Sequence, residues 1–279
     1  MTDVGGDEPS AARRPEVVRG RARDKMLRSA LRLGAPLALA SGAWLSSRRA
    51  EAAAEAAEAA RPTYIFFYGS CISAESRART GLSGTCLPCS VLGFERTWSA
   101  TVDLAKLNCV TNPAVKAVTA VSAQAKPDAR CNGVVVEVPE AELSAFDTRE
   151  VGYARTPIAP ELVKIDAPRC LALGLPISLP ENAQVFIYIH PEGAPTAAAP
   201  VIQSYLDVML LGCAEYGEAF ATDFLRTTKG WGKEKGSFVD DRALPAYVRA
   251  SEAAAARAAR WDELLKAQCP EALGARVKV

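Results

Sequence analysis

The stretch YIFFYGSCI, residues Tyr64–Ile72, is the strongest signal in the chain. It is a short aromatic and β-branched run that stops at Tyr68-Gly69-Ser70, which predicts a strand followed by a turn. Successive backbone N–H groups after such a turn bind anions when a helix begins close by. From these residues alone, an ordinary strand-to-helix turn and an anion-binding turn both remain open.

A second stretch, FDTREVGY at Phe146–Tyr153, contains Glu150 in a charged turn just past another strand-like run. A carboxylate in this position acts as a general base near neutral pH when burial raises its pKa. Val151 and Tyr153 supply an apolar wall for such burial, although charged turns of this kind are usually solvated. The two stretches together favour an enzyme that acts on a small anionic substrate.

The remaining patterns predict an α+β fold, because the strands come mostly first and the long helices mostly last. Gly212 and Gly217 predict a bend or break inside the longest apolar helix. The predicted strands, rich in β-branched and aromatic residues, are Tyr64–Phe67, Val91–Val102, Val115–Ser122, Gly133–Val138, Leu162–Ile165 and Val185–Ile189. The predicted helices are Ser73–Thr80, Glu140–Phe146, Ile202–Phe224 and Leu244–Ala267.

The overall charge argues against a nucleic-acid partner. The chain of 279 residues has 33 Lys and Arg against 32 Asp and Glu, a net charge of +1. This balance provides no electrostatic surface for nucleic acid, so any recognition of charge is local. A hydrophobic content of 49% is sufficient for an ordinary core.

Residues 1–61 differ from the rest and are predicted to lie outside the catalytic fold. An arginine-rich segment, Arg13–Arg32, precedes the apolar run Leu33–Ser47, which is shorter than the roughly 20 residues of a membrane span. No stable membrane span is therefore expected. A targeting segment and a disordered tail with a marginal helix are equally open, so the location is cytoplasmic or organellar. The expected organisation is an extension at 1–61, a domain at 62–250, and a C-terminal helix and tail at 251–279.

The cysteines and the single histidine point away from metal and triad chemistry. Cys86-Leu-Pro-Cys89 is a lone CxxC without the second pair that a zinc site needs, so it is structural or forms a local disulfide. His190 follows a strand-like run and precedes Pro191, which argues against a catalytic triad. No metal or cofactor is predicted. The eight cysteines, favoured as free apolar residues, are Cys71, Cys86, Cys89, Cys109, Cys131, Cys170, Cys213 and Cys269.

The stretch YIFFYGSCISAESRARTG, with FDTREVGYAR downstream, resembles the gamma-glutamylcyclotransferase-like superfamily. This superfamily includes gamma-glutamylcyclotransferases, ChaC-type glutathione-degrading enzymes and AIG2-like proteins. The resemblance covers about residues 63–250, and its specificity comes from the order of short motifs. The further matching segments are Cys131–Val135, Ser204–Gly212, Glu215–Gly217, and Asp241-Arg242 with Pro245 and Tyr247.

The resemblance implies a small mixed β-barrel with flanking helices, and an intramolecular reaction. The α-amine of a gamma-glutamyl substrate attacks its own γ-carbonyl and releases 5-oxoproline with an amino acid or amine. Glu150 matches the family's catalytic glutamate, and one carboxylate suffices as base and then acid, with no metal or cofactor. The implied substrate-binding residues are Tyr68, Gly69 and Ser70 of the glycine loop, its continuation Cys71 and Ile72, and Tyr153.

The chain departs from the family pattern after Tyr-Gly-Ser. The loop commonly continues Asn-Leu or Leu-Ile, whereas here it is Cys71-Ile72. Two hypotheses follow: a changed substrate preference, or a catalytically silent small-molecule binding or regulatory protein on the same fold. The thiol also suggests redox inactivation.

Further candidates come from outside the loop. Tyr205 and Arg155 are secondary site candidates, and Thr228–Ser237 with Trp231 is a lid or a plain surface loop. Glutathione, gamma-glutamyl dipeptides and gamma-glutamylamines share the recognised half of the substrate, so all three remain open.

Overall fold

The computed structural model describes residues 47–49, 51, 61–82, 84–104, 112, 115–191 and 193–279. The chain divides into two compact units, Met1–Ala59 and Ala60–Val279, and the second contains every element below. The predictions for Arg13–Arg32 and for most of Leu33–Ser47 lie outside the described residues. None of the helices in the described part of the chain has the length and apolar character needed to cross a membrane.

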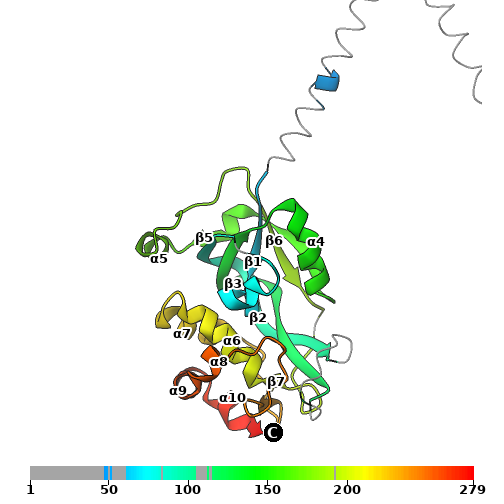
Figure 1. Cartoon of the computed structure of the whole chain (residues 1–279), viewed down its shortest axis with the longest axis vertical. Helices are drawn as coiled ribbons and strands as arrows, with labels where there is room; N and C mark the ends of the chain where they lie inside the picture. Colours follow the sequence, from blue (N-terminus) through cyan, green and yellow to red (C-terminus); the bar gives the residue numbers. More distant parts are fainter. Residues whose placement is uncertain are drawn as a thin grey trace, which may run out of the picture. The chain divides into compact units, whose positions relative to one another are not determined.

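A six-stranded sheet forms the centre of the second unit and curls strongly into a half-barrel (Figure 1). The first strand, β1, runs parallel to β6 and antiparallel to β3, and the other neighbours are antiparallel. This mixed sheet with its helices confirms the predicted α+β class. In spatial order the strands are β4 (Ala154–Ile158), β6 (Gln184–Ile189), β1 (Thr63–Phe67), β3 (Ala117–Glu137), β2 (Cys86–Asp103) and β5 (Val163–Ile165).

The long β2–β3 pair explains the curl. Its register shifts between Leu92 and Phe94, where Gly93 has φ +79 and the partner strand carries extra residues between Ala125 and Arg130. Bulges of this kind bend a strand and strengthen its twist. The two predicted strands Val115–Ser122 and Gly133–Val138 are therefore the two ends of one strand. Pro127 sits in its exposed bulged part, where no ladder hydrogen bond is needed.

Helix α4 (Glu140–Arg149) packs against the sheet through Leu143 and Phe146, and the Phe146 ring lies 5.4 Å from that of Phe67 in β1. It runs three residues beyond the predicted Glu140–Phe146. The charged turn expected around Glu150 is therefore the end of this helix, with Glu150 as its C-cap. The helix fixes where the Glu150 side chain begins.

The predicted break in the long helix is confirmed. Helix α6 (Gln203–Ala214) ends before Gly217, whose φ of +95 starts α7 (Glu218–Thr227). Gly212 stays inside α6, where a Cβ atom would lie 2.3 Å from the backbone nitrogen of Ser73. Glycine at this position lets α6 contact the chain directly after the short helix η1 (Ser70–Ile72).

The predicted helix Leu244–Ala267 is wrong at its start. Residues 244–250 are not helical, because the buried Asp241 carboxylate accepts the Ala246 N–H at 2.7 Å and so competes with helical hydrogen bonds. Helices α6 to α10 gather at one end of the unit in Figure 1, and α4 lies toward the other. The remaining elements are α3 (Ala74–Ala78), η2 (Pro160–Leu162), α5 (Ala167–Ala172), β7 (Val201–Ile202), β8 (Phe238–Asp240), α8 (Glu252–Ala255), α9 (Ala258–Gln268), α10 (Pro270–Ala275) and β9 (Arg276–Lys278).

The C-terminal segment 251–279 belongs to the same compact unit as the sheet. Trp261 and Leu265 of α9 are buried in the core. The last strand, β9, pairs in parallel with β8, which pairs in parallel with β7. This small second sheet holds the end of the chain against α6.

The seven cysteines in the described part of the chain are all free, and six of them are buried. Cys109 lies outside the described residues. Cys86 and Cys89 both belong to β2, and an odd spacing in a strand places side chains on opposite faces, which disfavours the local disulfide. Across the described ranges, no group of three or more His, Cys, Asp or Glu side chains is arranged to hold a metal ion.

Candidate active site

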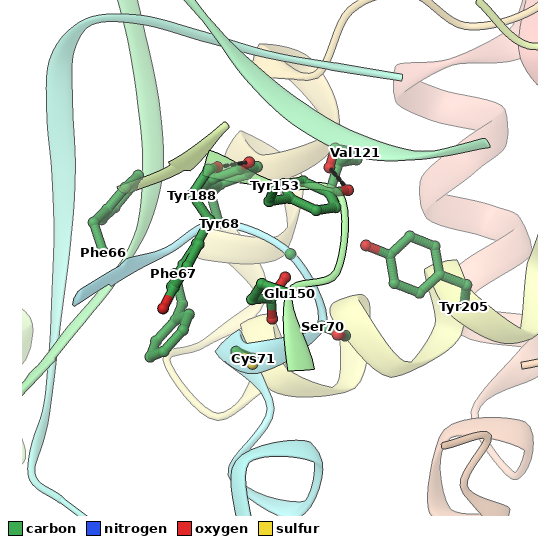
Figure 2. Close-up of a pocket in the computed structure, with 11 residues that line it drawn as sticks. Phe66, Phe67, Tyr68, Ser70, Cys71, Val121, Glu150, Tyr153, Tyr188 and Tyr205 are labelled. Atoms are coloured by element: carbon green, nitrogen blue, oxygen red, sulfur yellow. Dashed lines mark hydrogen bonds between the residues drawn. The ribbon is translucent and has the colours of Figure 1, made fainter. Parts of the chain in front are cut away.

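The two stretches singled out in the sequence meet at a small cavity of about 50 Å³ beyond the end of β1 (Figure 2). The turn after β1 forms one side, and Glu150 at the end of α4 forms another. Tyrosines from β6 and α6, and the one that follows Glu150, complete the wall. This space is called the narrow cavity below. Its lining residues are Phe66, Phe67, Tyr68, Gly69, Ser70, Cys71, Val121, Glu150, Tyr153, Tyr188 and Tyr205.

A second cavity of about 380 Å³, the wide cavity, shares four residues with the first. One of its walls is apolar and comes from β2, β3 and β7. The opposite wall is Ala246–Arg249, and Arg149 also lines the space. The two cavities therefore form one site with a small and a large compartment. The shared residues are Ser70, Glu150, Tyr153 and Tyr205.

Glu150 is held at this junction by its backbone. Its N–H donates to Phe146 O at 2.9 Å, and its own carbonyl accepts the Tyr153 N–H at 2.9 Å. Its side chain is 21% exposed. Burial raises the pKa of Glu150, whereas Arg149 and Arg249 act to lower it, and the net shift is upward. A carboxylate with a raised pKa can both take and return a proton near neutral pH.

Arg149 ties Glu150 to the turn, a role that the sequence patterns did not reveal. Its Nε lies 3.3 Å from Glu150 Oε1, and its side chain is 6% exposed. The same guanidinium donates to Ser76 O at 3.0 Å, to Ser70 Oγ at 3.4 Å and to Thr80 Oγ1. One buried cation thus fixes the carboxylate relative to the turn and to α3. The sequence feature that could have indicated this role is the position of Arg149 directly before Glu150.

The turn itself keeps space and donors free. A Cβ atom on Gly69 would lie 3.1 Å from Val121 Cγ2 and 3.2 Å from Tyr205 Oη, so glycine keeps the junction open. Within the described part of the chain, the N–H groups of Ser70 and Cys71 donate to no acceptor. They are the unpaired first donors of a short helix, which suits them to a carboxylate or an oxyanion.

The two residues that end the predicted loop differ in position. Cys71 lines the narrow cavity, and burial raises the pKa of its thiol to about 12. Ile72 is fully buried in the hydrophobic core and lines neither cavity. Its N–H closes the turn by donating to Gly69 O at 3.0 Å. The structure therefore does not place the predicted binding residue Ile72 at the site.

Among the described residues, the narrow cavity's tyrosines have hydroxyl groups that form hydrogen bonds, except for one. Tyr68 donates to Tyr188 O, and Tyr153 donates to Val121 O at 2.9 Å. The Tyr205 hydroxyl points toward the cavity in Figure 2, and no hydrogen bond joins it to any residue that the structure describes. Burial raises the pKa of Tyr68, Tyr153 and Tyr205, so all three stay protonated.

Two secondary candidates lie outside the site. Arg155 pairs with Asp147 at 3.5 Å and lines neither cavity. The loop Thr228–Ser237 is anchored: Lys229 N–H donates to Arg96 O at 2.9 Å, and the Trp231 ring packs 5.1 Å from that of Trp98. No residue of this loop lines a cavity of the site, which favours a plain surface loop over a lid.

Arg96 is a buried cation that contacts the turn, and no local sequence pattern indicated this role. Arg96 is fully buried and pairs with no carboxylate in the described part of the chain; its guanidinium donates to Tyr68 O at 3.3 Å and to Asn132 O at 2.7 Å. It also donates to Phe224 O at 2.9 Å and lies 3.6 Å from the centre of the Phe224 ring. One side chain thereby joins the end of β1, the middle of β3 and α7.

Comparison with known proteins finds similarity at the level of structure. No family model matches the sequence, and no curated protein does. A gamma-glutamyl cyclotransferase structure matches at 14% identity and TM-score 0.43, over 59% of this chain and 86% of its own. A gamma-glutamyl cyclotransferase specific to glutathione from yeast matches at 15% identity and TM-score 0.36, over 58% and 87%.

The protein YkqA from Bacillus subtilis matches at 16% identity and TM-score 0.38, over 62% of this chain and 58% of its own. The solved structures similar to this chain thus include gamma-glutamyl cyclotransferases, the group that its short motifs also resemble.

Proposed function

We propose that this chain is a gamma-glutamylcyclotransferase-like enzyme that converts a gamma-glutamyl compound into 5-oxoproline and an amino acid or amine. The observation that carries the proposal is the position of Glu150. It is a largely buried carboxylate with a raised pKa, facing a cavity that the Tyr68–Cys71 turn also lines. Among the described residues it is the only acid that lines either cavity.

The reaction needs one group that moves protons, and Glu150 supplies it. Its carboxylate takes a proton from the substrate's α-ammonium, and the freed amine attacks the γ-carbonyl carbon to close a five-membered ring. Protonated Glu150 then donates to the leaving nitrogen as its bond to the γ-carbon breaks. The ring nitrogen gives its extra proton to Glu150, from which it passes to the released amine. Base and acid are thus one residue used in turn.

The other groups of the site hold the reactants in place. Ring closure within one molecule depends mainly on orientation, which the narrow cavity restricts. The free N–H groups of Ser70 and Cys71 and the Tyr205 hydroxyl are donors for the α-carboxylate or the oxyanion that develops on the γ-carbonyl. Arg149 keeps Glu150 in position for these proton transfers.

The test is release of 5-oxoproline by the full chain from gamma-glutamyl-alanine, glutathione and gamma-glutamyl-ε-lysine. Glu150→Gln keeps the shape of the side chain and removes the base, so kcat falls by about 10²- to 10⁴-fold with little change in KM. Glu181→Gln, the same change on an exposed loop, leaves kcat unchanged. Wild-type turnover in Glu150→Gln would contradict the proposal.

A folded wild-type protein that releases nothing from the three substrates would also contradict it. Calorimetry with the same compounds would then show whether the site binds without turnover. Binding would favour the silent binding or regulatory protein on this fold. An assay of 5-oxoproline release and a calorimetric titration together distinguish an enzyme from a protein that only binds these compounds.

A further inference from the structure

The wide cavity contains a cation, Arg249, that has no partner among the residues the structure describes. Arg249 lines this cavity and is partly buried, and it makes no hydrogen bond or ion pair to any residue in the described ranges. Arg149, the other cation of the same cavity, is committed to Glu150, Ser76 and Thr80. A guanidinium that faces a cavity with its donors free is suited to a carboxylate, which it binds through two parallel hydrogen bonds.

The backbone around Arg249 is anchored on both sides. Upstream, Asp241 accepts the Ser204 hydroxyl at 2.6 Å and the Ala246 N–H at 2.7 Å. Downstream, the Ser251 hydroxyl donates to Glu75 Oε2 at 2.6 Å. Because the segment is fixed at both ends, Arg249 needs to order only its side chain when an anion binds.

The charged side chains that face the wide cavity carry one positive charge that is not compensated. Among the described residues, the titratable groups of its lining are Arg149, Arg249, Glu150 and three tyrosines, and the tyrosines stay neutral because burial raises their pKa. Glu150 offsets one of the two arginines. An anionic group of the ligand is therefore favoured near Arg249, which does not line the narrow cavity.

The volumes of the two cavities indicate which part of a substrate lies beside Arg249. The narrow cavity, at about 50 Å³, has room for only a few non-hydrogen atoms beside Glu150 and the turn. The reacting γ-carbonyl must lie near Glu150, so the leaving half extends into the wide cavity of about 380 Å³. A carboxylate on that half lies on the side of Arg249.

We propose that Arg249 binds a carboxylate on the leaving half, so that the enzyme selects gamma-glutamyl amino acids and peptides over gamma-glutamyl amines. The inference rests on the cyclotransferase function proposed for the Glu150 site. It names the substrate class that this function leaves open, and it makes Arg249 a specificity-determining residue.

The test compares two substrates that differ only by a carboxylate, gamma-glutamyl-alanine and gamma-glutamyl-ethylamide. For the wild-type full chain, kcat/KM is at least tenfold higher for gamma-glutamyl-alanine. Arg249→Met keeps an unbranched chain without the charge, and it lowers kcat/KM for gamma-glutamyl-alanine at least tenfold through KM. The ethylamide is affected less than twofold. Each variant is assayed on its own pH plateau, because Arg249 also acts on the pKa of Glu150.

Three further variants keep the test decisive. Arg249→Lys restores part of the preference because it restores the charge, and Arg249→Gln replaces Arg249→Met should that variant not fold. Arg257→Met removes the same charge from an exposed position and leaves both substrates unchanged.

An equal preference in the wild type, an unchanged ratio in Arg249→Met, or an equal loss on both substrates would overturn the inference. All three leave the proposed function standing, provided that Glu150→Gln abolishes release of 5-oxoproline. Absence of release from both substrates by the folded wild type would overturn the proposed function and the inference with it.

Discussion

The narrow and wide cavities meet at Glu150, but they differ in which of their polar side chains already have hydrogen-bond partners. In the narrow cavity the hydroxyl groups of Tyr68 and Tyr153 already donate to backbone carbonyls, so these residues chiefly set its shape. In the wide cavity Arg249 keeps its donors free among described residues. The difference suggests a division of labour: the narrow side positions the reacting atoms of every substrate, and the wide side discriminates between substrates. Each variant below tests that division.

The largest effect is expected where the two cavities join. Gly69→Val places methyl groups where a Cβ atom is already 3.1 Å from Val121 Cγ2 and 3.2 Å from Tyr205 Oη. We expect kcat/KM to fall at least 100-fold, about 2.7 kcal/mol, for gamma-glutamyl-alanine and gamma-glutamyl-ethylamide alike. Overpacking also lowers the free energy of unfolding by about 1–3 kcal/mol. Steady-state kinetics and urea unfolding measure the two effects.

Gly274→Val is the matched control, because a Cβ atom at Gly274 has no heavy atom within 4 Å. It should leave both substrates unaffected. If Gly69→Val instead changed the ratio between the two substrates, the junction would take part in discrimination, and the division of labour would be wrong.

A smaller effect separates the two kinds of tyrosine. Tyr205→Phe removes a hydroxyl that bonds to nothing in the described chain, so stability is unchanged while kcat/KM falls about tenfold, the size of one lost hydrogen bond to the reacting atoms. Tyr153→Phe removes a donor to Val121 O at 2.9 Å and costs about 1 kcal/mol of stability. Thermal unfolding and kinetics of both variants measure the contrast. A stability loss in Tyr205→Phe with unchanged turnover would reverse these roles.

Sequence patterns singled out several residues that the structure brings together around the narrow cavity, because these residues lie in short stretches with local signals. The strand, the glycine turn and Glu150 each have a local signal, and a family resemblance joined them. The prediction that Ile72 binds substrate does not agree with its position. In the short helix that follows the turn, its side chain is buried in the core instead of facing the cavity.

The wide cavity was beyond the reach of local patterns. Arg249 lies in a stretch whose composition predicts a helix, yet Asp241 holds that stretch open through bonds to Ser204, 37 residues away in sequence. Helical periodicity reports on neighbours three or four residues apart, so it carries no information about such a bond. For the same reason local patterns did not indicate Arg96, whose partners come from the turn after β1, from β3 and from α7.

The pH dependence of turnover tests, with a smaller expected effect, whether Arg249 acts on the pKa of Glu150. In the proposed reaction Glu150 must be ionised to accept the substrate's proton, so kcat/KM should fall as the pH drops through the pKa of Glu150. Burial raises that pKa, which places the acid limb above the ordinary glutamate value of about 4.3. Arg249→Met removes one of the two cations that lower the pKa, and the limb moves to higher pH. Arg257→Met does not move it. A limb that stays fixed in Arg249→Met would show that Arg249 does not act on Glu150.

The smallest effect is expected at Cys71, whose buried thiol tests whether the narrow cavity is open to oxidants and alkylating reagents. Burial raises the pKa of this thiol to about 12, so far less of it is thiolate at pH 7 than the few per cent of an ordinary cysteine. Iodoacetamide or hydrogen peroxide at pH 7 should leave the Cys71 peptide unmodified by mass spectrometry and turnover within twofold of the untreated protein. The urea-unfolded chain, in which the thiol regains its ordinary pKa, is the positive control and reacts readily. Rapid modification of Cys71 in the native protein, with loss of turnover, would instead make the narrow cavity a redox-sensitive site. The narrow cavity would then regulate turnover in addition to positioning the reacting atoms.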